Sequence, residues 1–181
     1  MRAICKKYLS SYCNITINCD RAENIRSEIK FDVIFVAQAF NLLNKELIKK
    51  SFSSILNQGS SVVLTWNNKS DYPLFNEIAT LSKNLCPMYA NSKAYTFDYK
   101  RHSLDDFFKK PPLFFKIKND VECQISEDIF LKRCLSTSYA PTREMHNYFE
   151  YYHGLKKIFE KYSNSGLIYY PLDTTVYIGE I

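Results

Sequence analysis

The sequence predicts an α/β fold: a mostly parallel sheet with helices on both faces and an antiparallel edge at the end of the chain. The run FDVIFVAQAF at 31–40 is apolar on both faces and rich in β-branched residues, as buried parallel strands are. A second run, SVVLTW at 61–66, follows one helical segment, and this strand–helix–strand order is typical of a parallel crossover. The closing run LIYYPLDTTVYIGEI has the pattern of two strands around a PLD turn, which predicts the antiparallel edge.

Composition is that of one folded domain, so we expect a single unit over 1–181. The chain has 181 residues, 46% of them hydrophobic and 24% charged, which are ordinary globular proportions. No stretch approaches the ~20 continuous apolar residues of a membrane span, and Lys6 and Lys7 stand where the apolar part of a signal peptide would lie. We therefore expect a cytoplasmic protein. The six cysteines show no CxxC spacing, so no metal site is expected.

The first half of the chain is expected to contain five elements. A helix is predicted over 1–11 and a short strand over 14–18, followed by a polar loop up to the strand at 31–40. Asn44 is expected to cap a helix that NQG at 57–59 ends. The apolar face of that helix should consist of Leu47, Ile48, Ser51, Phe52, Ile55 and Leu56. The strand SVVLTW comes next.

The second half is expected to carry a lid. A helix is predicted over 73–85, and the polar, aromatic segment that follows suggests a lid or substrate insertion at about 86–141. Within it, FFKIKNDVECQIS predicts a strand pair or one long bent strand, and Ser126 should cap a helix that buries Ile129, Phe130, Cys134 and Leu135. A helix over 142–162 should end at Gly166. Its buried stripe should contain Met145, Tyr148, Phe149, Tyr152, Leu155 and Phe159.

Several short segments of the sequence resemble those of the small-molecule branch of class I S-adenosylmethionine (SAM)-dependent methyltransferases, which includes quinone-biosynthesis and trans-aconitate methyltransferases. RAENI at 21–25 is similar to the loop after the family's third strand, and FDVIFVAQAF to its fourth strand and the loop that follows. SSILNQGSSVVLTWNN at 53–68 is similar to the next helix, turn and fifth strand. SEDIFLKRCLSTSYAP at 126–141 resembles the substrate-side helix, and LDTTVYIGEI resembles the final strand.

The resemblance implies an incomplete, truncated or split Rossmann-like domain. In the family, a G-x-G loop after the first strand lets the backbone approach the cofactor, and an acidic residue after the second strand holds the ribose. Both elements would lie before Met1, because the first glycine of this chain is Gly59. The loop after the fourth strand also departs from the family's Q-A-x-H-W, reading Gln38-Ala39-Phe40-Asn41-Leu42. Removing a central strand should also leave the run at 31–40 as an exposed edge, so we expect poor solubility or self-association.

The resemblance assigns cofactor-binding residues to two loops. Ala22, Glu23 and Asn24 would lie near the adenine ring of SAM. The alternative interpretation of this short segment is a polar surface turn. Gln38, Ala39 and Phe40 would form the floor of the cofactor pocket at the carboxyl end of a parallel strand, where open α/β sheets bind ligands.

Substrate-binding residues are assigned to the end of the fifth strand and to the lid. Trp66 and Asn67 could face a methyl acceptor, or the indole could cover the sheet edge. Tyr139 and Arg143 could close over an acidic or phenolic substrate, or they could mark a helix end and a solvated charge. No catalytic residue is assigned, because positioning supplies most of the acceleration in methyl transfer.

Three functions follow as hypotheses. The first is a methyltransferase-family chain acting on an unidentified small molecule and inactive without the cofactor loop. The second is a non-catalytic partner that binds an intact methyltransferase or a second copy of itself. The third is nucleic-acid binding, suggested by the net charge of +5 and by the lysines and aromatics between 95 and 118, but scattered basic residues disfavour it.

Overall fold

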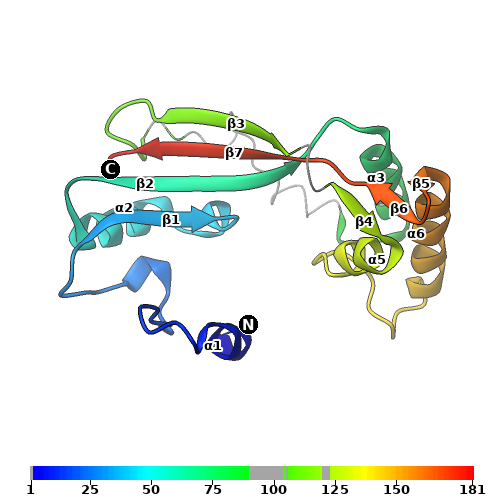
Figure 1. Ribbon diagram of the computed structural model, residues 1–181, viewed down its shortest axis with the longest axis horizontal. Coiled ribbons are helices and arrows are strands. Elements are labelled where there is room, and N and C mark those ends of the chain that lie inside the picture. Colours follow the sequence, from blue (N-terminus) through cyan, green and yellow to red (C-terminus); the bar gives the residue numbers. More distant parts are fainter. Residues whose placement is uncertain (1, 90–103, 105, 120–122) are drawn as a thin grey trace.

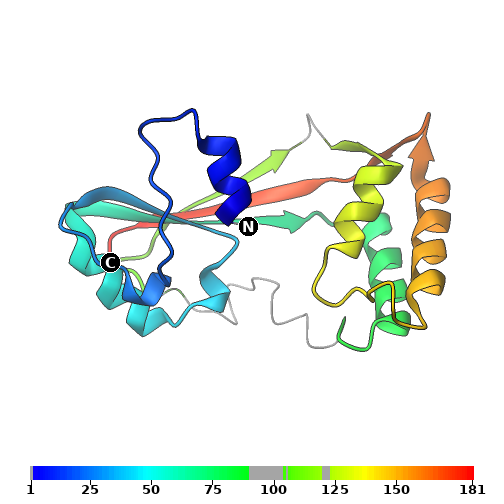
Figure 2. The same ribbon diagram turned by 90° about the horizontal axis from the view of Figure 1, so that it is seen from below.

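The computed structural model describes residues 2–89, 104, 106–119 and 123–181, which form two groups of elements (Figure 1). The first is a four-stranded sheet in the order β1-β2-β7-β3, with helix α2 on one side of it (Figure 2). The second contains helices α3, α5 and α6 and a small sheet in the order β4-β6-β5. The α/β class predicted from the sequence is confirmed. The four-stranded sheet is not mostly parallel, however, because β1–β2 is its one parallel pair among the described strands and β7 is antiparallel to both of its neighbours. Within the described part, none of the helices has the length and apolar character needed to cross a membrane.

The predicted crossover is confirmed. Strand β1 (Phe31–Ala37) pairs in parallel with β2 (Leu56–Lys69), and α2 (Lys45–Ile55) connects them. Asn44 caps α2 as expected, since its side chain accepts a hydrogen bond of 3.1 Å from the backbone N–H of Leu47. Two positions of the predicted apolar face are wrong: Leu47 is exposed, and Leu56 belongs to β2. The helix turns directly into the strand, so it ends before the expected NQG.

The predicted antiparallel strand is present, but it is not an edge. Strand β7 (Leu172–Gly179) lies between β2 and β3 (Leu113–Asn119) and runs antiparallel to both. Strand β3, which falls inside the segment expected to form a lid, is therefore part of the main sheet. The run 114–126 is neither a hairpin nor one strand, because β4 (Gln124–Ser126) pairs in the small sheet instead. Residues 90–103, 105 and 120–122 of the expected lid lie outside the described residues.

The last predicted hairpin is divided between the two sheets. β5 (Ser163–Asn164) and β6 (Leu167–Tyr169) form a hairpin whose two turn residues, Ser165 and Gly166, have φ of 50° and 77°. Two left-handed residues in a two-residue turn match the right-handed twist of paired strands. Gly166 therefore makes this turn, and it does not end the preceding helix as predicted.

Three helices form the second group: α3 (Pro73–Leu85), α5 (Glu127–Leu135) and α6 (Tyr148–Tyr162). The bounds predicted for α3 are confirmed. In α5, Phe130 and Cys134 are buried as expected, but Ile129 is exposed. Helix α6 starts later than predicted, because Thr142 to Asn147 form successive turns instead of helix. Its buried stripe is also shifted, and consists of Tyr148, Tyr151, Leu155, Ile158 and Phe159.

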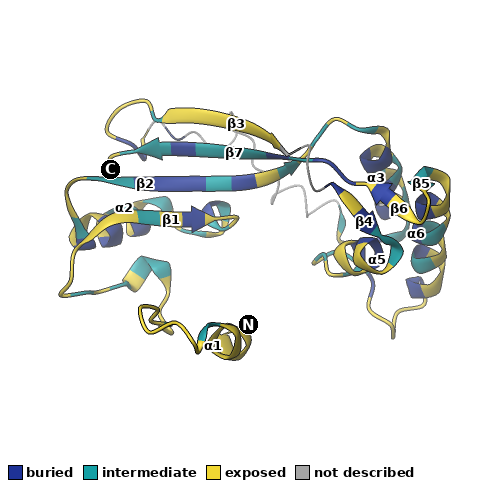
Figure 3. Cartoon of the chain, viewed as in Figure 1, coloured by how far each residue is buried: buried dark blue, intermediate teal, exposed yellow. Residues whose placement is uncertain are grey.

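The N-terminal elements differ most from the predictions. Helix α1 (Arg2–Leu9) forms where expected, but none of its residues is buried. The predicted strand at 14–18 is absent from this described segment, whose backbone has no ladder partner. Strand β1 is parallel as predicted but not buried, since it forms the edge of the sheet and leaves Phe31, Val33 and Phe35 exposed (Figure 3). The apolar pattern correctly predicted a strand here, but it could not predict whether another element would cover that strand.

Candidate functional site

The carboxyl end of β1 is marked by an unusual backbone at Gln38. This residue has φ of 58°, a left-handed conformation that costs a non-glycine residue about 1 kcal/mol or more. Its N–H still donates to the carbonyl of Thr65 on β2, at 2.9 Å. The chain is therefore held to β2 through Gln38 and turns away immediately afterwards, into the short 3-10 helix η2 (Phe40–Leu42).

Phe40 anchors this turn in the core beneath the sheet. Its side chain is 1% exposed and packs edge-to-face on Trp66, with ring centroids 6.1 Å apart, and on Phe107 at 4.8 Å. The indole N–H of Trp66 donates to the side-chain carbonyl of Asn41 at 3.0 Å. The loop after β1 and the end of β2 are thus joined by one aromatic cluster and one polar–aromatic pair.

The Asn41–Trp66 pair was not predicted. The sequence showed Asn41 at the place where the resembled family has an imidazole, and this substitution suggested the loss of a polar–aromatic pair. The structure shows such a pair formed across the ends of two strands, with Trp66 as the aromatic member. Reading Asn41 together with the only Trp of the chain could have suggested it.

The loop with Ala22, Glu23 and Asn24 forms the 3-10 helix η1 (Ala22–Asn24), which lies against α2. The Glu23 carboxylate accepts a hydrogen bond from the N–H of Asn44 at 3.4 Å, and Arg21 lies 3.8 Å away. Hydrogen bonds from its own backbone N–H and from that of Asn44 hold the pKa of Glu23 below its usual value. Glu23 therefore stays ionised and ties the loop to the start of α2.

The two loops assigned to the cofactor meet at one core cluster. Ala22 and Ala39 both pack against the cluster that contains Phe40 and Trp66. This cluster also includes Ile48 and Phe52 of α2. The structure therefore brings the backbone of η1 and the end of β1 to the same part of the sheet.

The four residues assigned to the substrate are not brought together. Trp66 is 2% exposed and lies on the covered face of the sheet, whereas Asn67, the next residue along β2, lies on the opposite face and accepts from the Thr174 hydroxyl at 2.8 Å. Tyr139 packs against the core cluster of the second group and contacts the Tyr89 ring edge-to-face, with centroids 5.0 Å apart. Arg143 is exposed in the turns before α6.

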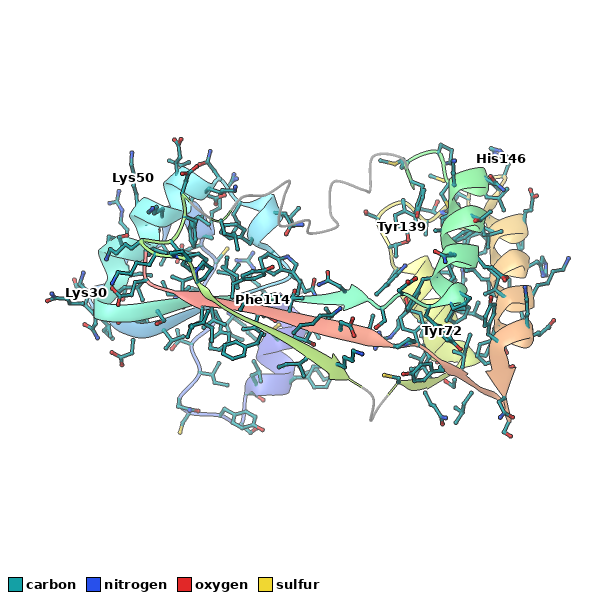
Figure 4. All side chains as sticks on the ribbon, turned by 90° about the horizontal axis from the view of Figure 1, so that it is seen from above. Lys30, Lys50, Tyr72, Phe114, Tyr139 and His146 are labelled. Atoms are coloured by element: carbon teal, nitrogen blue, oxygen red, sulfur yellow. The ribbon has the colours of Figure 1, made fainter. Side chains whose placement is uncertain are left out.

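Of the two substrate candidates in the helical group, Tyr139 is the half-buried one. Burial raises the pKa of its phenol, and its hydroxyl forms hydrogen bonds with the Thr137 and Ser82 side chains. In Figure 4 it lies nearer to the four-stranded sheet than His146 does, on the side of the helices that is turned toward that sheet.

Comparisons with known proteins describe only the architecture. No family model and no curated protein matches this sequence. Among solved structures, YcgJ from Bacillus subtilis is similar over 100% of this chain and 79% of its own, with 13% identity and a TM-score of 0.48. The methyltransferase BH2331 from Bacillus halodurans is similar over 97% and 76%, with 8% identity and a TM-score of 0.48.

A third similar structure is the plantazolicin methyltransferase BpumL, determined with a triazolic desmethylPZN analog and SAH. The similarity covers 96% of this chain and 63% of BpumL, with 11% identity and a TM-score of 0.39.

Proposed function

We propose that this chain carries part of the site of a SAM-dependent methyltransferase acting on a small molecule, and that it does not transfer methyl groups alone. The observation that supports the proposal most is the strained turn at Gln38. It sits at the carboxyl end of a parallel strand, where open α/β sheets bind ligands, and strained backbone is concentrated at functional sites.

SAM fits the residues present only in part. The backbone of η1 and the turn from Gln38 to Phe40 lie around one cluster and would hold the adenosine side of the cofactor. The side chain of Glu23, however, is already engaged with the start of α2. No glycine precedes Gly59, so residues 2–58 contain no G-x-G loop for the methionine side. A segment that bears such a loop would complete the cofactor site.

Bound SAM would supply a methyl group that its sulfonium sulfur activates for displacement by the electron pair of an acceptor. The chain's own residues would act by positioning, which can supply most of the acceleration. The turn at Gln38 and Phe40 forms a fixed floor, because Phe40 is locked between Trp66 and Phe107. Tyr139 would donate a hydrogen bond to an oxygen of the acceptor.

A calorimetric titration of SAM and SAH tests the proposal, first on the chain alone and then with a polypeptide that bears a G-x-G strand. We expect no saturable binding alone, and binding in the micromolar range together with methyl transfer when the segment is present. Asn24→Ala should weaken binding about tenfold, by loss of one polar contact. The matched control is Asn57→Ala, an exposed asparagine at the amino end of β2. Failure of every such segment to restore binding would contradict the proposal.

A second function is supported by the unpaired edge of β1. A non-catalytic partner of an intact methyltransferase could dock there, because an edge strand offers a row of free backbone N–H and C=O groups. Immobilised chain should then retain an intact small-molecule methyltransferase and change its rate. A methyltransferase that is neither retained nor altered would eliminate this function.

A further inference from the structure

The two faces of the four-stranded sheet differ in what covers them. One face carries Val62, Leu64, Trp66 and Tyr177, all buried in the same cluster as the apolar residues of α2. Because side chains alternate along a strand, the residues between these point to the opposite side. We call that side the open face. It faces away from α2 (Figure 2).

The strand register defines the members of the open face. Val33 and Phe35 of β1 pair with Ser61 and Val63 of β2, and Val63 and Thr65 pair with Ile178 and Val176 of β7. In turn, Leu113, Phe115 and Ile117 of β3 pair with Ile178, Val176 and Thr174. These eleven residues carry no charge: Val33, Phe35, Ser61, Val63, Thr65, Leu113, Phe115, Ile117, Thr174, Val176 and Ile178. The same alternation places Asn67 and Lys69 at the end of this face near the helices, where the Lys69 ammonium lies 5.4 Å from the centroid of the Phe75 ring on α3.

Large apolar side chains of this face are exposed. Val33 is 47% exposed and Phe35 71%, while Leu113, Phe115 and Ile117 are 65%, 48% and 55% exposed. A phenylalanine side chain presents about 150–250 Å² in full and an aliphatic one presents less, so the five leave about 400–500 Å² of apolar area open. A patch of that size is at the upper end of what monomers show and marks an interaction site. Figure 3 shows this exposure on β1 and β3, the two outer strands.

We propose that a second copy of this chain covers the open face, so that two sheets pack face to face across a two-fold axis. Among the paired residues of the open face, Lys69 alone is charged. So low a charge argues against nucleic acid or any partner recognised through ion pairs, since such partners need several charged contacts. A twisted, apolar sheet face is self-complementary, because two sheets of the same hand pack about 10 Å apart in sandwiches.

The available area agrees with a dimer of moderate affinity. Two copies together would bury about 800–1,000 Å² from the five exposed side chains alone, near the lower limit for a specific interface. Thr65, Val176 and Ile178 add to this area from the inner strands. Such a contact closes on itself and does not grow into a filament.

Sedimentation velocity from about 1 to about 100 µM protein tests this inference. We expect a species of twice the chain mass that dissociates on dilution. Phe35→Lys and Phe115→Lys should each raise the dissociation constant at least about 100-fold, because every substitution places two charges in the interface. The matched control is Phe149→Lys, since Phe149 is 65% exposed on α6 and should leave the dimer unchanged.

Placing the two variants on opposite edges of the sheet separates the alternatives. If Phe35→Lys alone dissociates the dimer, the contact is made by the edge of β1 and face packing is excluded. A wild-type chain that is monomeric at every concentration, or that binds only an added polypeptide segment, also overturns the inference. The milder variants Phe35→Thr and Phe115→Thr keep strand propensity and guard against misfolding, which far-ultraviolet circular dichroism would reveal. None of these results depends on methyl transfer.

Discussion

Gln38 is the residue at which local backbone preference and the fold conflict. A glutamine rarely adopts a φ of 58°, so the conformation is imposed by its bond to Thr65 and by the buried Phe40 two residues later. The same turn directs the loop toward η1. The conflict thus occurs at the place where the sequence predicts the cofactor, which is where such conflicts are expected in functional proteins.

Gln38→Gly should stabilise the chain by about 0.5–1 kcal/mol, because glycine accepts the left-handed conformation without a Cβ clash and keeps the backbone N–H that bonds to Thr65. Urea unfolding measures the change. Ser165→Gly is the matched control, since Ser165 has a similar φ of 50° in a surface hairpin and should gain a similar amount. A loss of stability in Gln38→Gly alone would show that its side chain makes a contact that outweighs the strain.

Helices α3 and α6 approach each other closely where α6 carries Gly154. A Cβ at this position would lie 2.6 Å from Cδ1 of Leu81 on α3. Such a distance is too short for two carbon atoms, so the Leu81 side chain must move before an alanine can fit, although glycine lowers helix stability by about 1 kcal/mol relative to alanine.

Gly154→Ala should therefore destabilise the wild-type chain, yet stabilise a Leu81→Ala background by about 1 kcal/mol, where only the helix propensity remains. Urea unfolding of the four proteins of this double-mutant cycle measures the coupling. Equal effects of Gly154→Ala in both backgrounds would mean that the two helices do not meet at this point.

Strands β3 and β7 are joined to the end of β2 by Asp173. Its carboxylate lies 2.8 Å from the ammonium of Lys116 and accepts from the Ser70 hydroxyl at 3.0 Å. The hydrogen bond from Lys116 is the main reason why the pKa of Asp173 is lowered below its usual value of 3.8. A carboxyl whose pKa is lower in the folded state than in the unfolded state favours folding above its unfolded pKa, and this contribution is lost as the pH falls through the folded pKa.

The chain should therefore lose stability below about pH 4 partly through Asp173. Asp173→Asn should lower the free energy of unfolding at pH 7 but reduce the further loss between pH 4 and pH 2. Asp128→Asn provides the control, because Asp128 is 68% exposed in its pair with Lys132 and such pairs contribute little. Parallel acid curves for wild type and Asp173→Asn would contradict this role.

Two hydrophobic clusters, one under the sheet and one among the helices, make up the described core. The sequence predicts one domain, which requires that the clusters unfold together. Trp66 is the only tryptophan and belongs to the sheet cluster, so its fluorescence reports on that cluster, while circular dichroism follows the helices.

We expect the two signals to give the same unfolding midpoint, as a cooperative domain requires. Phe130→Ala, which removes a fully buried ring from the helical cluster, should cost about 3–5 kcal/mol and shift the Trp66 signal as much as the helical signal. Phe149→Ala, at an exposed position of the same group, is the control. Separate midpoints would divide the chain into two independently folding units.

By itself, the sequence determined those helices and strands whose position depends on neighbouring residues in the chain. Helix α3 has its predicted bounds, and Asn44 caps α2, because spacing, caps and proline act within one or two turns. The parallel pair β1–β2 was predictable for the same reason, since two apolar runs with one helix between them admit few arrangements. The loops around Ala22 and Gln38 were identified by resemblance, and their assignment to the cofactor stays a prediction.

Only the tertiary structure decided which strands have neighbours and which helix faces are covered. The placement of β7 inside the sheet, the division of 114–126 between two sheets and the shifted stripe of α6 all depend on partners distant in sequence. The exposure of Phe35 has the same origin, because an apolar pattern states what a strand can bury and not whether anything lies against it. Strand pairing and packing depend on residues that are distant in sequence, so the periodicity of one segment does not predict them.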